Sequence, residues 1–412
     1  MMAIVANSCV SAPRVAEPLG ELRVLVDLLE EKHVEPPPRE RLVAAARDAM
    51  LASVDPYSSY LDADTYAELQ IALSSRLGGV GLRVEPDGAR FRVRGPLLGS
   101  PALRAGLRPG DLLFSVDGRP VEGQPLTTVL SWLRGEAGTS VDVVLARAAS
   151  SEPVRARLTR EPIALASVRG VRRRGGAWDH QAPGNASVAY LRIAIFSQTT
   201  EQEVARALEA IERLEPRGLV LDLRHNQGGL LSAAVAVADL FLPEGRIVTE
   251  RGRGGATKHF EATAGVATTR PLAVLVDEAT VSAAEVLAAA LQDNRRAVVV
   301  GARSFGKGTV QQIFPLGPGA GAYRLTVEHY LRPSGLSIER HWPGAAAERG
   351  GVVPDEGLAV SATDGDALAN ALEDADADAS VALDDTELPS IADPALAAAC
   401  AALLARPASV AR

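Results

Sequence analysis

Cysteine, long apolar runs and excess positive charge are scarce or absent in this sequence, and each shortage narrows the possible functions. The two cysteines, Cys9 and Cys400, stand near opposite ends of 412 residues, so they indicate neither a disulfide framework nor a zinc site. No run of about 18 apolar residues occurs, which argues against an integral membrane span. A net charge of -8 argues against a nucleic-acid partner, because binding phosphates needs a basic face.

Lysine is equally rare: Lys32, Lys258 and Lys307 are the only three, and arginine carries the remaining positive charge. Arginine stays protonated in proteins, whereas the amine of a lysine can lose its proton and act as a base. Because this chain uses arginine for nearly all of its positive charge, a lysine is expected where its different chemistry is needed. Lys307 is therefore a candidate base.

The length and the local patterns predict several domains, because 412 residues exceed what one hydrophobic core usually organises. From Ala186 to about Val360, apolar strands alternate with helical runs, which is typical of a mainly parallel α/β core built from βαβ units. The predicted segments are a leader or disordered stretch (1–20), a region of three short helices (21–76), a small half-open β-barrel with two helices (77–160), the α/β core (161–360) and an acidic Ala-rich tail with a short helix (361–412).

The stretch VVVGARSFGKGTV, residues 298–310, has nearly the spacing of a phosphate-binding loop, because Gly301, Gly306 and Lys307 follow an apolar strand. Two features argue against a nucleotide site. Gly308 stands where a hydroxyl residue should hold magnesium, and TVQQIF has the pattern of a strand rather than of a helix that faces phosphate. A base is the better interpretation of Lys307, since an amine becomes a base where burial or nearby cations bring its pKa towards neutrality.

Two further stretches place reactive groups at strand ends. Ser282 stands between the apolar strand LAVLVD and an amphipathic helix, where a hydroxyl is exposed together with helix-terminal amides. Gly228 and Gly229 lie between a strand and a helix, where glycine leaves backbone amides available for an oxyanion hole. A helix N-cap at Ser282 and a tight turn at the glycines explain each feature equally well alone. Their occurrence on successive strand ends of one core favours a catalytic site.

Eight segments of the chain match one known family. They are DPYSSYL, GGVGLRV, SPALRAGLRPGDLLFSVDG, LSWLRGEAGTSV, LVLDLRHNQGGLL, EVLAAALQDNRRAVVVGARSFGKGTVQ, LRPSGLSIE and GVVPD. Through them the sequence resembles the carboxyl-terminal processing proteases, serine peptidases with a PDZ domain and a Ser-Lys catalytic pair. The resemblance covers roughly residues 20 to 360. It implies an α/β multidomain fold: a spiral ββα-type peptidase core, an inserted PDZ domain (77–160) and an N-terminal helical region.

The resemblance also implies a role for each matching residue. Ser282 matches the nucleophile, Lys307 the general base, and Gln311 the residue that orients the lysine amine. The backbone amides of Gly228 and Ala283 match the oxyanion hole. The loop that matches the carboxylate-binding loop of PDZ domains consists of Gly79, Val80, Gly81 and Leu82. The implied activity is cofactor-free and metal-free cleavage of protein substrates near their C termini through an acyl-enzyme.

A few positions depart from the family. His225 and Gln227 stand where Asn and Pro are usual, and Ala284 where Ser is common. His225 is a possible base in a Ser-His arrangement, but no carboxylate is obviously placed to orient it, since Asp222 is expected to face the core or the strand end. A loop histidine that lines the cleft is the favoured alternative. Asp293 is expected to be a capping or surface carboxylate.

Two rival functions stay open: a catalytically inactive PDZ adaptor on a peptidase-like scaffold, and an acyl-CoA-handling enzyme on a similar core. The intact set of Ser282, Lys307 and Gln311 counts against the first, and the PDZ insertion against the second. The expected partners are proteins or peptides with free C termini, with an adaptor or a homo-oligomer as further alternatives. The family implies an extracytoplasmic compartment, although the opening MMAIVANSCVSA lacks the basic n-region of a secretory signal. Whether the PDZ domain inhibits or only recruits is left open.

Overall fold

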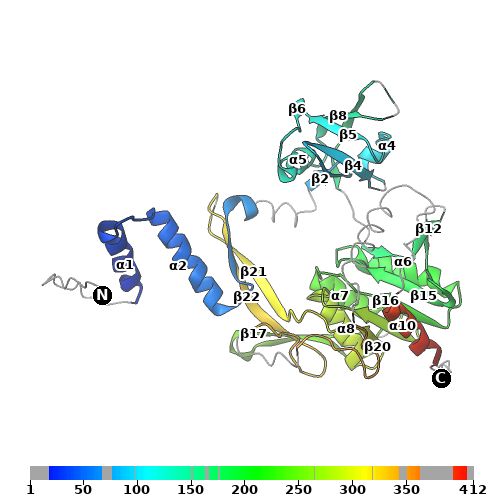
Figure 1. Ribbon diagram of the computed structural model, residues 1–412. Coiled ribbons are helices and arrows are strands. Elements are labelled where there is room, and N and C mark those ends of the chain that lie inside the picture. Colours follow the sequence, from blue (N-terminus) through cyan, green and yellow to red (C-terminus); the bar gives the residue numbers. More distant parts are fainter. Residues whose placement is uncertain are drawn as a thin grey trace. The chain divides into compact units, whose positions relative to one another are not determined.

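The computed structural model describes residues 18–405, apart from 67–76, 98, 149, 151, 163–166, 175–176, 264, 318, 343–349 and 362–392 (Figure 1). The chain divides into two units: Met1–Asp64 with Gln311–Thr326, and Thr65–Val310 with Val327–Arg412. The predicted leader, third N-terminal helix and acidic stretch fall mostly outside the described residues.

Two helices and a short strand open the first unit: α1 (Pro18–Lys32), α2 (Arg39–Val54) and β1 (Ser59–Leu61). Three consecutive prolines separate the helices, and Pro38 precedes α2 with a φ of -53°, which its ring imposes. After α2 the carboxylate of Asp55 accepts hydrogen bonds from the N–H (2.7 Å) and the hydroxyl (2.5 Å) of Ser58, which turns the chain into β1. β1 pairs antiparallel with the first residues of β22 (Ala322–Leu331).

Residues 77–162 form an antiparallel β domain with its own hydrophobic core. The main sheet has the order β3-β4-β5-β8-β9 with β6 beside β5, and β2 lies between β7 and β10. A helix spans Leu126–Leu133, and a turn at Asp117–Gly118 joins β5 to β6. The elements are β2 (Leu77–Gly79), β3 (Leu82–Asp87), β4 (Arg90–Pro96), α4 (Pro101–Arg104), β5 (Leu112–Val116), β6 (Arg119–Pro120), α5 (Leu126–Leu133), β7 (Gly135–Glu136), β8 (Ser140–Ala146), β9 (Val154–Thr159) and β10 (Glu161–Pro162).

A mixed sheet of order β11-β15-β16-β19-β20, with β14 beside β15, forms the centre of the second unit. Its last four strands run parallel, as the alternation of strands and helices predicted. β16 and β19 are buried along their whole length, as expected when helices cover both faces of a sheet. The bounds are β11 (Val168–Arg169), β14 (Gln181–Ala182), β15 (Asn185–Ile193), β16 (Gly218–Asp222), β19 (Leu272–Val276) and β20 (Ala297–Gly301).

Helices cover the two faces of this sheet through alternating strand residues (Figure 1). Leu221 and Val274 pack in one core with α6, α7 and α8, whereas Val220 and Leu275 pack in another with α10. Gly218 lets α10 pack closely on the sheet, because a Cβ at residue 218 would lie 3.2 Å from the side chain of Leu403. The helices are α6 (Thr200–Glu212), α7 (Leu231–Asp239), α8 (Ala283–Asp293) and α10 (Pro394–Ala405).

The smaller elements complete the described chain. β17 pairs antiparallel with β18 and with the last residues of β22. Because the residues after Lys307 form β21, as predicted, the helix that a phosphate-binding loop requires is not present there. These elements are β12 (Arg172–Arg174), β13 (Ala177–Asp179), β17 (Arg246–Gly252), η1 (Arg253–Gly255), β18 (Thr257–Glu261) and β21 (Thr309–Pro315).

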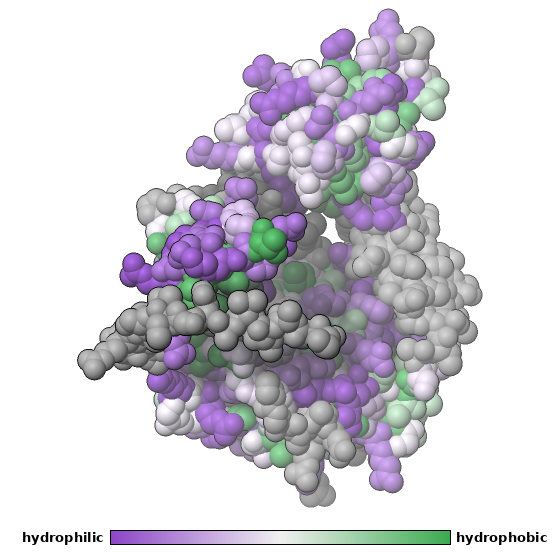
Figure 2. Space-filling model, turned by 60° about the vertical axis from the view of Figure 1, so that its left-hand side comes forward, coloured by the Kyte–Doolittle hydropathy of each residue, from purple (hydrophilic) through white to green (hydrophobic). Residues whose placement is uncertain are grey.

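The coloured residues on the face in Figure 2 are mostly purple or pale, with green hydrophobic residues among them. The large apolar side chains of the three hydrophobic cores lie inside. Among the helices that the structure describes, none is long and apolar enough to cross a membrane.

Candidate active site

Ser282 lies at the junction between β19 and α8, as predicted. Its backbone has φ 59° and ψ -118°, a conformation that costs a residue with a side chain about 1–3 kcal/mol. The side chain of Ser282 at this turn is half-buried. Strain of this kind persists only where surrounding contacts impose it, and here a buried carboxylate does so.

Glu285, in the first turn of α8, binds four donors with its carboxylate. One oxygen, Oε2, accepts the N–H of Ser282 at 2.8 Å and the N–H of Lys307 at 2.9 Å. The other, Oε1, accepts the hydroxyl of Ser304 at 2.5 Å and the N–H of Gly306 at 2.6 Å. A single oxygen thus keeps the backbones of the predicted nucleophile and the predicted base within two hydrogen-bond lengths of each other.

The carboxylate of Glu285 is fully buried. Burial raises the pKa of this carboxyl, and the four hydrogen bonds counter part of the rise. Three of the four partners are backbone N–H groups, which can only donate, so the carboxylate oxygens serve them as acceptors. Sequence reasoning missed Glu285, although Ser282 and Glu285 have the spacing of a capping box, which predicts the hydrogen bond between the glutamate and the Ser282 amide.

The glycine loop before α7 packs directly against the Ser282 turn. A Cβ at Gly228 would lie 2.8 Å from the carbonyl oxygen of Val281, 3.0 Å from Cβ of Ser282 and 3.1 Å from the nitrogen of Ala283. With φ +94°, this position also favours glycine for its conformation. The two residues that match an oxyanion hole, Gly228 and Ala283, therefore lie next to each other and to the candidate nucleophile.

The side chain of Asn226 fixes the glycine loop through hydrogen bonds. Its side chain is fully buried, donates from Nδ2 to the carbonyl of Ile193 and accepts the N–H of Gly228 at 2.8 Å. Its own carbonyl accepts the N–H of Val281 at 2.9 Å. The Gly228 amide is thus donated to Asn226 in this structure, so an oxyanion that binds this amide must draw it away from Asn226.

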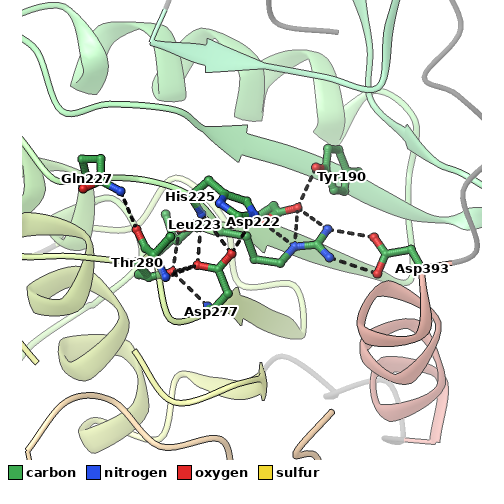
Figure 3. Close-up of polar contacts among 10 residues, drawn as sticks. Tyr190, Asp222, Leu223, His225, Gln227, Asp277, Thr280 and Asp393 are labelled. Atoms are coloured by element: carbon green, nitrogen blue, oxygen red, sulfur yellow. Dashed lines mark hydrogen bonds and ion pairs between the residues drawn. The ribbon is translucent and has the colours of Figure 1, made fainter. Parts of the chain in front are cut away.

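His225 pairs with Asp277, a residue that the sequence analysis did not single out (Figure 3). Its Nε2 lies 3.1 Å from Oδ2 of Asp277, and its backbone N–H points at both carboxylate oxygens. The expectation that no carboxylate orients His225 is therefore wrong. Asp277 also accepts the hydroxyl of Thr280, so the pair ties the loop before α7 to the loop before α8. Asp277 comes just after β19, and the carboxyl ends of neighbouring parallel strands meet at one edge.

A second ion-pair network lies one residue earlier in the same loop (Figure 3). The guanidinium of Arg224 is 4% exposed and donates to two carboxylates, Asp222 at 2.6 Å and Asp393 at 2.8 Å. The hydroxyl of Tyr190 donates to Asp222 at 2.8 Å. Asp222 is fully buried at the end of β16, as predicted, whereas Asp393 directly precedes α10. The C-terminal helix is thereby linked to the loop that carries Gly228.

Opposite charges keep Asp222 ionised. Burial alone would raise the pKa of its carboxyl, but the charge and hydrogen bonds of Arg224, helped by Arg192, lower that pKa below the ordinary value of 3.8. A carboxyl with a lowered pKa stabilises the folded state above its ordinary pKa, and this contribution is lost as the pH falls through the lowered value.

Replacing Asp393 with Asn is expected to lower the free energy of unfolding by about 2 kcal/mol, because it removes one of two charges that compensate a buried guanidinium. Urea unfolding measures the change. Asp48→Asn is the matched control, since Asp48 is 60% exposed in an ion pair with Arg47 and such pairs contribute little. Equal midpoints for the two variants would show that Asp393 does not stabilise the fold.

Two other predicted residues have clear surroundings. Gln311, on β21, donates from Nε2 to the hydroxyl of Thr326 at 3.3 Å. Asp293, at the end of α8, forms a partly buried ion pair with Arg332 at 2.6 Å, a structural contact rather than a catalytic one. Among the described residues no group of three or more His, Cys, Asp or Glu side chains is placed to hold a metal ion.

Comparisons with known proteins identify two domains and a family. Residues 187–357 match peptidase family S41, and residues 92–147 match a PDZ domain. A carboxyl-terminal-processing protease of Synechocystis sp. is 39% identical over 333 residues, which are 80% of this chain and 74% of the relative. A carboxy-terminal-processing protease of Bartonella bacilliformis is 35% identical over 321 residues, 76% of this chain and 71% of the relative. The solved photosystem II D1 C-terminal processing protease has 31% identity and a TM-score of 0.48, over 84% of this chain and 88% of that one.

The matched domains define a serine-type peptidase that carries a PDZ domain in a mixed α/β chain. The chain belongs to the carboxyl-terminal processing proteases of peptidase family S41. The family that the sequence segments indicated is therefore confirmed, and proteins are its substrates.

Proposed function

We propose that this protease cleaves its substrates near their C termini by a Ser-Lys mechanism with an acyl-enzyme intermediate and without a cofactor. The hydroxyl of Ser282 attacks the scissile carbonyl while neutral Nζ of Lys307 accepts its proton. Lys307 then gives that proton to the leaving amine. In the second half, Lys307 takes a proton from water, the hydroxide attacks the ester, and the proton returns to Oγ of Ser282.

The observation that carries this proposal is the shared hydrogen-bond acceptor at Glu285. Because Oε2 binds the N–H groups of both Ser282 and Lys307, the two side chains start from adjacent backbone positions. Proton transfer requires its partners within hydrogen-bond reach, and a common anchor for both backbones favours that geometry. In this mechanism Gln311 orients the amine of Lys307, as the family resemblance implies.

The proposed oxyanion hole consists of the N–H groups of Gly228 and Ala283. The adjacency of these two residues to Ser282 supports the proposal, because a substrate carbonyl attacked by the Ser282 hydroxyl would lie close to both of them. Loss of one such donor typically costs about 3 kcal/mol of transition-state stabilisation. Because the Gly228 amide is donated to Asn226 at rest, the developing negative charge competes with a neutral amide oxygen for that donor. A charged acceptor forms the stronger bond.

The PDZ domain is proposed to bind the free C terminus of the substrate in the loop from Gly79 to Leu82. The carbonyl of Val80 accepts the N–H of Ala102 at 2.9 Å, and the carbonyl of Gly81 accepts the N–H of Leu97 at 2.7 Å. In a trans peptide the N–H points opposite to the C=O, so the N–H groups of Gly81 and Leu82 point away from these partners. Two neighbouring amides that point the same way form a site for a carboxylate.

Several further expectations belong to the same proposal. They are the domain boundaries 21–76, 77–160 and 161–360, the spiral ββα arrangement of the peptidase core, an extracytoplasmic location, and assembly as a homo-oligomer or with an adaptor. One relative, from Tetradesmus obliquus, is by its name chloroplastic.

A serine-directed phosphonate is expected to label Ser282 and to stop cleavage in proportion to labelling, because only an activated hydroxyl displaces the phosphonate leaving group. Mass spectrometry of the digested protein identifies the labelled residue. Ser282→Ala is the control that should take up no label. An unlabelled wild-type protein that still binds C-terminal peptides would instead support the alternative of an inactive PDZ adaptor.

A further inference from the structure

A second buried carboxylate, that of Glu339, contacts the loop that carries Lys307. Its Oε2 accepts the N–H of Gly308 at 2.9 Å, directly after the candidate base. Its Oε1 accepts the N–H of His341 at 2.6 Å, so the carboxylate also holds the segment to which it belongs. Glu339 is 4% exposed, and burying a carboxylate costs free energy unless hydrogen bonds compensate it. Its place beside the base makes Glu339 a candidate for a role in catalysis.

The segment around Glu339 packs tightly along this loop. A Cβ at Gly308 would lie 2.3 Å from the nitrogen of Glu339. A Cβ at Gly306 would lie 2.1 Å from Cγ of Arg340, whose N–H donates to the carbonyl of Gly306 at 3.1 Å. The carbonyl of Gly308 accepts the N–H of Tyr330 at 2.8 Å. The two glycines therefore allow the two segments to lie in direct contact, and both backbone groups of Gly308 are bound.

Two peptide planes determine the direction of the Lys307 side chain. The plane before its Cα carries the N–H of Lys307, which binds Oε2 of Glu285 at 2.9 Å. The plane after its Cα carries the N–H of Gly308, which binds Glu339. Because each peptide unit is rigid, the orientations of these two planes set φ and ψ of Lys307 and hence the direction of its Cα–Cβ bond. Each carboxylate thus fixes one of the two planes.

The length of the lysine side chain makes this control of the backbone important. The amine lies at the end of a flexible four-carbon stem, so a tilt of the backbone moves it farther than it moves Cβ. Proton transfer works over a hydrogen-bond length, and a misplacement of about 1 Å costs about a hundredfold in rate. Without the carboxylate of Glu339, the N–H of Gly308 would lose the acceptor that it has in this structure, and the plane after Cα of Lys307 could turn.

We infer that Glu339 is a positioning residue for Lys307, and that Glu285 and Glu339 together hold the direction in which the base points. The inference rests on the proposed role of Lys307 as the base and specifies what aligns it. It makes a segment that follows β22, rather than a strand of the central parallel sheet, a part of the machinery that supports catalysis.

Steady-state cleavage of a fluorogenic peptide by the full chain tests the inference. Glu339→Leu keeps much of the side-chain volume and removes both acceptor oxygens, so we expect kcat to fall about a hundredfold while KM changes less than about threefold. Glu339→Gln keeps one acceptor oxygen for Gly308, because the N–H of the exposed His341 can turn to water, and should keep kcat within about tenfold of the wild type. Glu244→Leu, at an exposed position between α7 and β17, is the matched control and should change neither constant.

The Lys307→Met background shows whether Glu339 acts through the lysine. If it does, adding Glu339→Leu to Lys307→Met should lower the residual rate by less than about threefold, because the amine that Glu339 positions is already gone. Long incubation and mass spectrometry of the products measure rates this low. An equal loss in both backgrounds would overturn the inference, since Glu339 would then support the fold or the nucleophile instead.

An ester between residues 307 and 308 covers the case in which Glu339→Leu does not fold. Glycolic acid, introduced at position 308 by translation in vitro, removes the N–H that Glu339 binds and leaves Glu339 in place, and kcat should again fall about a hundredfold. An ester protein with the wild-type kcat, or a folded Glu339→Leu protein with it beside an inactive Lys307→Met protein, would overturn this inference alone. Wild-type activity of Lys307→Met would instead overturn the Ser-Lys mechanism, and the inference with it.

Discussion

Replacing Lys307 with Arg is expected to lower kcat/KM by at least about a thousandfold and to leave the protein folded. Arginine keeps the positive charge and a long side chain but cannot be deprotonated in a protein, so it cannot accept the proton of Ser282. A general base contributes typically 10²–10⁴-fold to the rate, and here the same group serves acylation and deacylation. Cleavage of a fluorogenic peptide measures the loss, and a thermal melt measures the fold.

Lys258→Arg is the matched control for this substitution. Lys258 is 68% exposed on β18, where its amine lies 3.8 Å from Glu250, so the same chemical change there should alter neither activity nor melting temperature. If the Lys307→Arg protein keeps a tenth or more of the wild-type kcat/KM, the lysine is not the base. A protein that loses both activity and fold would be followed by Lys307→Met, which removes the amine and keeps most of the apolar stem.

The strand ends were predictable because local patterns determine them. Ser282 follows an apolar strand and precedes an amphipathic helix, and Gly228 follows another strand, so the parallel order of the sheet brings both to one edge. Glu285 was predictable in part, since its spacing from Ser282 is that of a capping box. Its hydrogen bonds to Ser304, Gly306 and Lys307 were not, because they join α8 to a loop that begins after β20.

One long-range ion pair left no trace in the local sequence. Arg224 and Asp393 are 169 positions apart, and nothing near Asp393 distinguishes it from the other acidic residues of the C-terminal region. Only the packing of α10 on the sheet, where Gly218 admits Leu403, brings Asp393 to Arg224. The pairing of His225 with Asp277 was predictable only in part. Both residues stand at predicted strand ends, but the direction of each side chain depends on the loop conformation.

Replacing Glu285 with Gln is expected to lower kcat by about a hundredfold or more with a much smaller change in KM. The amide keeps the shape of the carboxylate but has one acceptor oxygen, so its NH₂ group must face at least one of the N–H groups of Ser282, Gly306 and Lys307. Such a buried clash of donors moves the backbones of the nucleophile and the base relative to each other. A misplacement of about 1 Å costs about a hundredfold in rate.

The distinction between kcat and KM is the decisive readout for Glu285. It binds backbone groups behind the reacting atoms, so its loss should affect the positions of Ser282 and Lys307 rather than the affinity for a tail. The rate of phosphonate labelling of Ser282 should fall in parallel with kcat, because both need the activated hydroxyl. Glu278→Gln makes the same substitution at an exposed position five residues before α8 begins and should change neither rate. If the Glu285→Gln protein is folded and keeps its kcat, the shared oxygen is not what brings the serine and the lysine together. The two side chains would then depend on their own contacts for alignment.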